Sequence, residues 1–194
     1  MTPRLVTGLW LLALLSIPLG ATADISPNQE DGPASYKLKG GGGLELRVPA
    51  DPAHPWNTVK HDDVLLVLER PPVPEKGLPF GLLLVAVEQG PDTTTGIDWD
   101  RVKDNIISAA KNSGSDLKLN LGGSWQVGKN LTEQGVQAQK LVGSMTANER
   151  EVDVSMVAMV APGRLVTISE LGPTGGGASV YEKVARSVRM AASR

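Results

Sequence analysis

The sequence predicts an α+β fold in which helices cover both faces of an antiparallel β-sheet, as in an α/β/α sandwich. Two observations support this prediction. Residues 64–68 (VLLVL) and 82–87 (LLLVAV) are short, continuously apolar runs, which are typical of strands buried on both faces. The elements follow one another as strands, a helix, further strands and a closing helix, and this order favours the α+β class.

The remaining strands are predicted from alternating apolar and polar residues, which place one face of a strand against a core. This pattern occurs in residues 44–48, 117–121 and 152–160, and residues 135–145 are also predicted to form a strand. Residues 165–171 are predicted to return as the partner strand of residues 152–160 in a hairpin. Pro162 followed by Gly163 suits a type II turn between them.

Two helices are predicted from apolar residues that recur at intervals of three and four. The first covers residues 98–112 and is preceded by a capping box, Thr95–Asp98. The second lies within residues 178–194 and starts with a capping box of its own, Ser179–Glu182. In both stretches the apolar side chains share one face, so each helix is expected to pack against the sheet.

The N-terminal residues have the layout of a secretory signal peptide. Arg4 precedes a mostly apolar run over residues 5–19, and Ala21–Ala23 matches an A-x-A cleavage site. An uncleaved membrane anchor is the less favoured alternative, because a run of about 15 residues is shorter than the roughly 20 that a spanning helix needs. We expect cleavage after Ala23, a periplasmic or secreted location and no membrane insertion of the mature chain.

The mature chain is predicted to contain a flexible linker, residues 24–35, and one domain, residues 36–194. The absence of cysteine excludes disulfides, thiolate metal sites and a cysteine nucleophile. The net charge is −2 at pH 7, and the basic residues do not gather in the sequence. Nucleic acid is therefore not an expected partner.

The glycine run Gly40–Gly43 raises the question of phosphate binding. A P-loop places its glycines between a strand and a helix, and a Lys and a Ser or Thr follow. Here the predicted strand 44–48 follows the glycines, and no such pair is present. We interpret the run as a turn, the bend of a hairpin with residues 36–39. Gly175–Gly177 precede the closing helix without a basic neighbour, and we interpret them as a flexible helix entry.

No catalytic or cofactor-binding residue is predicted. Serines are plentiful, but no G-x-S-x-G elbow supports a Ser-His-Asp triad. Histidine and carboxylate side chains suit a divalent metal ion, and one stretch contains Asp51, His54, His61, Asp62 and Asp63. Adjacent side chains diverge, so we favour a solvated turn over a metal site for this stretch.

Trp56 and Trp125 lie in loop-like sequence, where a large aromatic side chain can anchor a partner. We favour core positions for both, because the chain has only one Phe and two Tyr. The long loop over residues 71–80 and the segment over residues 51–63 are the predicted contact surface. The candidate contact residues are His54, Trp56, His61, Asp62, Asp63, Pro74 and Phe80.

Four features, taken in order, resemble the superfamily of the photosystem II extrinsic protein PsbP, which includes the DcrB-like proteins and the Ran-binding Mog protein. They are an opening strand leading to P-x-D and a Trp (LELRVPADPAHPW), two strands and a helix, a late hairpin (VDVSMVAMVAPGRLVTISEL) and a closing helix (VYEKVARSV). The resemblance covers residues 36–192. The glycine-rich opening and the PAH spacer before Trp56 depart from the family pattern, and no family binding residue matches a position here.

This resemblance implies an α/β/α sandwich and a non-enzymatic role as an accessory protein bound to a larger partner. We therefore expect an exported, soluble protein that acts through protein–protein contact in the cell envelope, such as an adaptor or immunity protein of a secretion system. The alternative is a metal-binding protein or metal-dependent enzyme that uses His54, His61, Asp62 and Asp63. No cofactor is expected.

Overall fold

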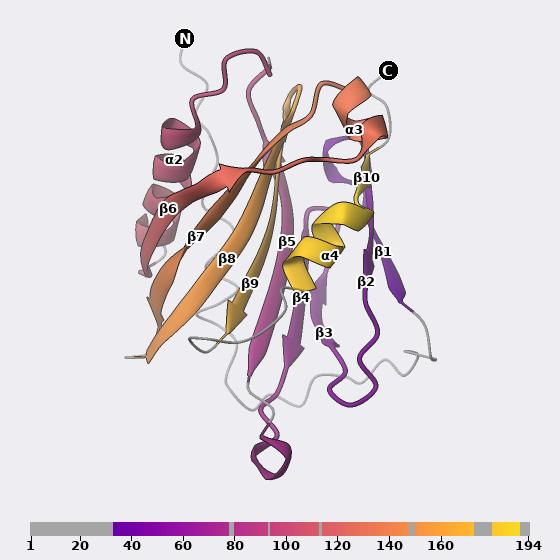
Figure 1. The fold of residues 1–194 in the computed structure, drawn as a ribbon, viewed down its shortest axis with the longest axis vertical. Helices are drawn as coiled ribbons and strands as arrows, with labels where there is room; N and C mark the ends of the chain where they lie inside the picture. The colour runs from indigo at the N-terminus through magenta and orange to yellow at the C-terminus, as the bar shows by residue number, and fades with distance from the viewer. Residues whose placement is uncertain are drawn as a thin grey trace.

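The computed structural model describes residues 33–77, 80–92, 94–112, 114–147, 150–172 and 180–190 of the 194-residue chain. The predicted signal peptide and residues 24–32 of the predicted linker lie outside this part. The described residues form an α+β fold that is mostly β, with two antiparallel sheets and three α-helices (Figure 1). None of the described helices is long and apolar enough to cross a membrane.

The larger sheet has seven strands in the order β3-β4-β5-β9-β8-β7-β6, and every neighbouring pair is antiparallel. The strands are β3 (Asn57–His61), β4 (Leu65–Arg70), β5 (Gly81–Gln89), β6 (Asp116–Ser124), β7 (Gln137–Ala147), β8 (Arg150–Ala161) and β9 (Arg164–Gly172). Ala161 pairs with Arg164, so Pro162 and Gly163 form the tight turn between β8 and β9. Gly163 has φ 72°, the sign that a type II turn requires at this position. The predicted hairpin is confirmed.

The smaller sheet joins the first and last described strands in the order β1-β2-β10. Its strands are β1 (Ala34–Leu38), β2 (Leu44–Val48) and β10 (Arg189–Met190). β1 begins inside the predicted linker and pairs with β2, so the predicted N-terminal hairpin is confirmed. The glycines form its bend as a 3-10 turn, η1 (Gly40–Gly42). A Cβ at Gly40 would lie 2.7 Å from Asp63 O, the atom that Gly40 N binds at 2.6 Å, so this position needs a glycine.

The helices are α2 (Trp99–Asn112), α3 (Lys129–Glu133) and α4 (Val180–Ser187), and a 3-10 turn, η2 (Pro74–Lys76), lies in the long loop. The prediction of α2 is confirmed. Asp98 caps it directly, since its carboxylate accepts a hydrogen bond from Arg101 N at 3.0 Å. The closing helix is shorter than predicted, because the chain leaves the helix after Ser187 and pairs with β2. Ser179 of the predicted capping box lies outside the described residues.

Two hydrophobic cores lie on opposite faces of the larger sheet. On one face, β4, β5, β8 and β9 pack against the smaller sheet and α4, and this core includes Leu46, Leu83 and Val184. On the other face, Leu84 and Val160 belong to a second core, against which the apolar side of α2 packs. Figure 1 shows α4 in front of the larger sheet and α2 behind β6 and β7. The predicted helix layers are therefore seen only in part, because the smaller sheet provides much of the cover on one face.

The predicted burial of the two doubly apolar runs is confirmed except at Val64, which is partly exposed and precedes β4. Leu65 to Leu68 in β4 and Leu82 to Val87 in β5 are at most 7% exposed. Odd and even positions of β5 alternate between the two cores, as expected for a strand covered on both faces. Among the described α-helices and strands, three were not predicted: β3, which lies in the segment assigned to a contact loop, the short helix α3, and β10, whose residues were assigned to the closing helix.

Gly143 in β7 provides a test of how closely β6 and β7 approach. A Cβ at this position would collide with the Lys118 carbonyl oxygen and lie 2.8 Å from the carbonyl carbon. We expect Gly143→Ala to lower the free energy of unfolding by about 1–3 kcal/mol, because neither backbone can move away without loss of pairing. Urea unfolding measures this difference.

Gly172→Ala is the matched control, because Gly172 also lies in a strand. Its Cβ would meet nothing closer than 3.8 Å, an ordinary contact. This variant should change the stability by less than about 0.5 kcal/mol. Equal destabilisation by the two substitutions would contradict the close approach of β6 and β7.

Glu88 in β5 makes stability depend on pH. Burial raises its pKa from 4.5 to about 7. Between these two values the folded protein retains a proton that the unfolded chain has released, so stability falls as pH rises through this window.

Glu88→Gln should therefore unfold at a higher urea concentration than the wild type at pH 8, and at about the same concentration at pH 4. Allowing for its partial exposure, the expected gain at pH 8 is on the order of 1–2 kcal/mol. The exposed Glu151 provides the control substitution, Glu151→Gln. A gain for Glu88→Gln that is equal at both pH values would show that the side chain, and not its ionisation, causes the effect.

Candidate functional site

The predicted contact residues are divided between the two ends of β4. His54, Trp56 and Pro74 lie near its C-terminal end, where the chain enters the long loop, and Phe80 precedes β5. His61, the last residue of β3, lies at its N-terminal end together with Asp62 and Asp63 of the turn between β3 and β4. Five peptide units of β-strand separate the two ends by about 17 Å. The candidates therefore do not form one continuous surface.

His54 and Trp56 are buried, at 5% and 4% exposed. His54 Nε2 lies 2.7 Å from Pro71 O, and His54 N donates to the Asp51 carboxylate at 3.2 Å. The Arg70 guanidinium stacks 4.0 Å above the Trp56 ring and lies 3.3 Å from the Asp51 carboxylate. This cluster fixes the segment before β3 against the end of β4. The core position favoured for Trp56 is confirmed.

The turn between β3 and β4 is held by its own polar groups. Asp62 Oδ1 accepts hydrogen bonds from Val64 N at 2.9 Å and Leu65 N at 2.8 Å. Burial acts to raise the pKa of Asp62, but these bonds and the nearby Lys60 outweigh it and hold the pKa below its usual value. The ring of His61 lies edge-on to that of Tyr36, and its Nε2 is 3.0 Å from a backbone oxygen.

These contacts bear on the metal alternative. His54 and His61 lie on different elements, and each has a ring nitrogen within hydrogen-bond distance of a backbone oxygen. Asp62 is occupied by backbone amides. Throughout the described ranges, no group of three or more His, Cys, Asp or Glu side chains is placed to hold a metal ion.

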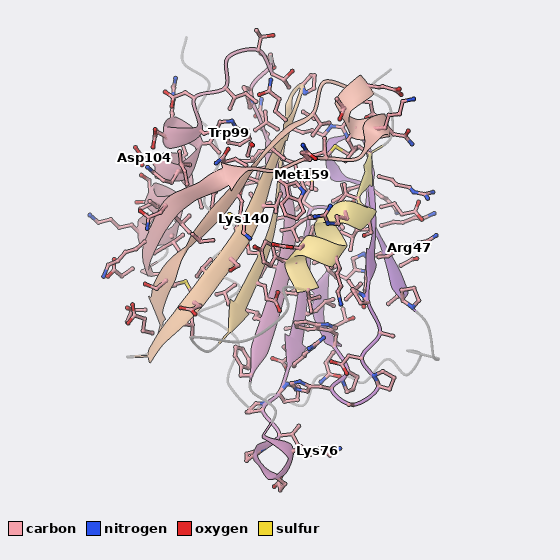
Figure 2. The ribbon with its side chains drawn as sticks, viewed as in Figure 1. Arg47, Lys76, Trp99, Asp104, Lys140 and Met159 are labelled. Carbon is pink, nitrogen blue, oxygen red and sulfur yellow. The ribbon has the colours of Figure 1, made fainter. Side chains whose placement is uncertain are left out.

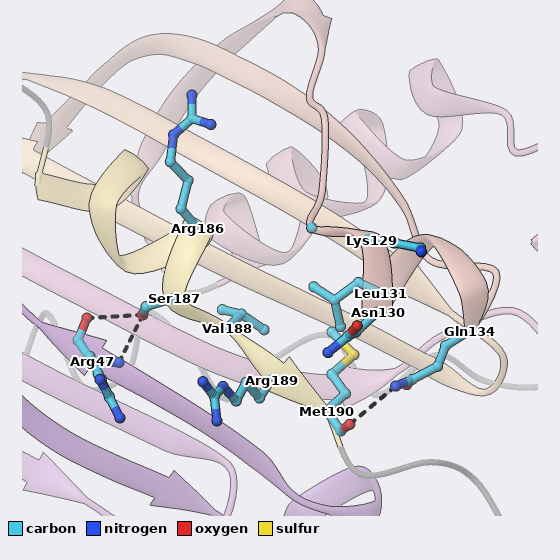
Figure 3. A pocket seen from close by; sticks show the side chains of 11 residues that line it. Arg47, Lys129, Asn130, Leu131, Gln134, Arg186, Ser187, Val188, Arg189 and Met190 are labelled. Carbon is cyan, nitrogen blue, oxygen red and sulfur yellow. Dashed lines mark hydrogen bonds between the residues drawn. The ribbon is translucent and has the colours of Figure 1, made fainter.

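A different site gathers charge, and we call it the basic pocket. It is a cavity of about 590 Å³ between β2, α3, the end of α4 and β10 (Figure 3). Its lining residues are Arg47, Gly128, Lys129, Asn130, Leu131, Gln134, Arg186, Ser187, Val188, Arg189 and Met190. Four of these side chains are cationic and none is acidic, so the pocket attracts anions.

The local backbone fixes the position of each part of the pocket. Arg47 N donates to Ser187 Oγ at 2.8 Å, which joins β2 to the last residue of α4. Gln134 Nε2 donates to Met190 O at 3.4 Å, which joins the chain after α3 to β10. Leu131, at 4% exposed, belongs to the same core as Met190. The pocket is therefore built on packed elements and not on a loop.

The charges around the pocket have few competing partners. Lys129 lies 3.8 Å from Glu133, in a pair that is largely exposed. The Arg186 guanidinium stacks 4.7 Å from the ring of Trp125, which is partly buried against the core. Arg47 and Arg189 make no ion pair with another described residue. The lining of the pocket contains no histidine or carboxylate, and its charged side chains are of the kind that bind anions.

The first turn of α4 is held by carboxylates on the side away from the pocket. Glu170 of β9 accepts a hydrogen bond from Tyr181 N at 3.1 Å. Burial raises the pKa of Glu170, while this bond opposes the rise. Glu182 accepts a hydrogen bond from Lys140 Nζ at 2.8 Å, and Figure 2 places Lys140 between the sheet and α4. These contacts orient α4, and so place its last turn at the pocket.

Comparisons with known proteins leave the function open. No protein-family model matches the chain, and no curated protein sequence matches it either. A crystal structure of a protein from Bacteroides thetaiotaomicron matches part of the chain, with a TM-score of 0.46 and 13% sequence identity. The match covers 76% of this chain and 45% of that protein, so the chain spans less than half of its length.

The basic pocket could not be read from the sequence. Arg47, Lys129, Arg186 and Arg189 belong to four different elements. The chain has a net charge of −2, so composition gives no indication of a basic site. The one available signal was the spacing of Arg186 and Arg189, which equally suits the polar face of a longer helix.

Proposed function

We propose that this chain is an exported, non-enzymatic binding protein of the cell envelope, and that its binding site is the basic pocket. The observation that carries the proposal is the gathering of four cationic side chains around a pocket with no acidic lining residue. In a protein with a net charge of −2, this local excess of positive charge raises the concentration of anions at one place. The ligand is therefore an anion, or a partner with an acidic group at its surface.

The family assignment remains a proposal. We infer a PsbP-like or DcrB-like domain with the layering of an α/β/α sandwich, and three features support it. They are the order of the elements, the antiparallel larger sheet and the late hairpin of β8 and β9. An accessory role, as this resemblance implies, fits the same site, since an acidic group of a protein partner would meet the same four cations.

Export is tested by the mass of the mature protein. We expect the native chain to be recovered from the periplasm or the medium with Asp24 as its first residue, because Ala21–Ala23 matches a cleavage site. Cell fractionation and intact-mass measurement decide this. Recovery of the uncleaved chain in the cytoplasm would contradict the proposed location and leave the pocket unaffected.

Anion binding is tested by removing two cations together, with the double substitution Arg47→Gln and Arg189→Gln. Pyrophosphate and citrate should raise the melting temperature of the wild type more than that of the double variant. The reason is that a ligand stabilises the fold only to the extent that it binds the folded state. Differential scanning fluorimetry over a concentration series measures the difference.

The control is the double substitution Lys76→Gln and Lys118→Gln, which removes the same charge far from the pocket. Figure 2 shows Lys76 at the far end of the molecule from Arg47. Pyrophosphate and citrate also stabilise proteins by exclusion from their surface, and this effect is common to all variants. If the wild type and both double variants show the same increase in melting temperature, the basic pocket binds neither pyrophosphate nor citrate. This result would contradict the proposed anion site.

A further inference from the structure

We propose that the ligand of the basic pocket is an amphipathic acid, a carboxylate or phosphate group that carries a hydrocarbon chain. This inference rests on the proposed function and specifies its ligand. The acidic group would lie at Arg47 and Arg189, and the hydrocarbon chain on the apolar floor of the pocket. Each part of this assignment follows from a separate observation.

The two arginines form one place for an acid. In the pairing of β2 with β10, Arg189 lies opposite Glu45, and Arg47 is two residues further along β2. Residues two apart on a strand share a face, so Arg47 and Arg189 extend from the same face of the smaller sheet. Figure 3 shows both side chains on the same side of the pocket. The facing carboxylate, Glu45, lies 4.0 Å from Lys37, so its charge is shared. Two guanidinium groups are well suited to hold one carboxylate or phosphate.

The floor of the pocket is apolar and lies on the core side of the smaller sheet, since Met190, next to Arg189 in β10, points to the opposite face from Arg189. Leu131, Val188 and Met190 line the pocket and are 4%, 6% and 6% exposed. They come from α3, from the residue after α4 and from β10, and Figure 3 shows their side chains gathered at the centre of the pocket. An ion that is fully hydrated gains nothing from such a surface. A hydrocarbon chain gains free energy there, because it leaves water.

The other two cations do not form a second clamp for an acid. Figure 3 shows Lys129 and Arg186 pointing away from Arg47 and Arg189. Arg186 is stacked on Trp125, and Lys129 is near Glu133. These side chains add to the positive potential without converging on one point. The arrangement therefore provides one position for an acidic group, at Arg47 and Arg189.

The smaller sheet offers little to a peptide in this place. β2 pairs with β1 on one side and, at Leu44 and Glu45 only, with β10 on the other, while the backbone N and O of Arg47 are both hydrogen-bonded to Ser187 Oγ. Met190 O of β10 already accepts the hydrogen bond from Gln134. Extended peptides are commonly held by main-chain hydrogen bonds to a free strand edge, and a hydrocarbon chain needs none. The geometry thus favours a small amphipathic acid over the end of a partner chain.

The test compares ligands that differ in one feature at a time. Calorimetric titration of the wild type would use inorganic phosphate, butyl phosphate, octyl phosphate, octanoate and octyl glucoside, each below its micelle concentration. Octyl phosphate should bind at least about tenfold more tightly than butyl phosphate, because each buried methylene adds to the affinity. Octanoate compared with octyl phosphate identifies the preferred acid. The uncharged octyl glucoside should not bind measurably.

Two variants locate the parts of the ligand. The double substitution Arg47→Gln and Arg189→Gln should lower the affinity for butyl phosphate and for octyl phosphate by the same factor. Met190→Gln should reduce the ratio of the affinity for octyl phosphate to that for butyl phosphate. Melting curves establish that each variant folds. If Met190→Gln does not fold, Leu131→Thr serves in its place, and the chain-length comparison on the wild type is independent of both. A fluorophore on the single thiol introduced by Lys129→Cys reports binding at the pocket, because the chain has no other cysteine.

Several results would overturn the inference. Equal affinity for inorganic phosphate, butyl phosphate and octyl phosphate would reveal a simple anion site, and the proposed function would stand without this ligand. If octyl glucoside bound as tightly as octyl phosphate, the acidic group would play no part in binding. Tighter binding of the peptide acetyl-Gly-Gly-Leu with a free carboxylate than of octanoate would assign the site to a chain end. The absence of binding by every acid would overturn the proposed function as well.

Discussion

The burial of both faces of β5 and β9 is the constraint on which the rest of the structure depends. Leu83 and Val85 lie in one core, and Leu82 and Leu84 lie in the other. A strand of this kind is stable only if separate layers exclude water from both of its faces. On one face the cover is α2. On the other face, the smaller sheet and α4 share this role. The pocket forms where the smaller sheet and α4 adjoin each other.

The basic pocket arises at the place where this cover is least continuous. The smaller sheet ends at the two-residue strand β10, α4 ends at Ser187, and α3 closes the third side. Side chains that point inward from these ends complete the core, as Leu131 and Met190 do. Long cationic side chains cannot be buried there without partners, so they extend outward around the opening. The apolar floor and the charged rim are thus two results of the same junction.

Most elements were predictable from their hydrophobic pattern, whereas β3, α3 and β10 were not. β4, β5, β8, β9 and α2 bury long apolar stretches, and the sequence shows their period directly. β3 (NTVKH) is an edge strand with only one strongly apolar residue, so it resembled a loop. The end of α4 was mispredicted because Val188 continues the helical spacing, although the backbone leaves the helix to pair with β2. Here a tertiary contact outweighs a local preference, and the pocket depends on that contact.

The pairing of β10 with β2 also has a consequence for how the fold is completed. It joins Leu44 to Met190 across nearly the whole described chain, so loop closure over this separation must precede the pairing. A chain released only up to residue 188 would have both sheets nearly formed, yet it would lack part of the rim and part of the floor of the pocket. If the pocket has the proposed function, the ability to bind a ligand would therefore be acquired last, when β10 pairs with β2.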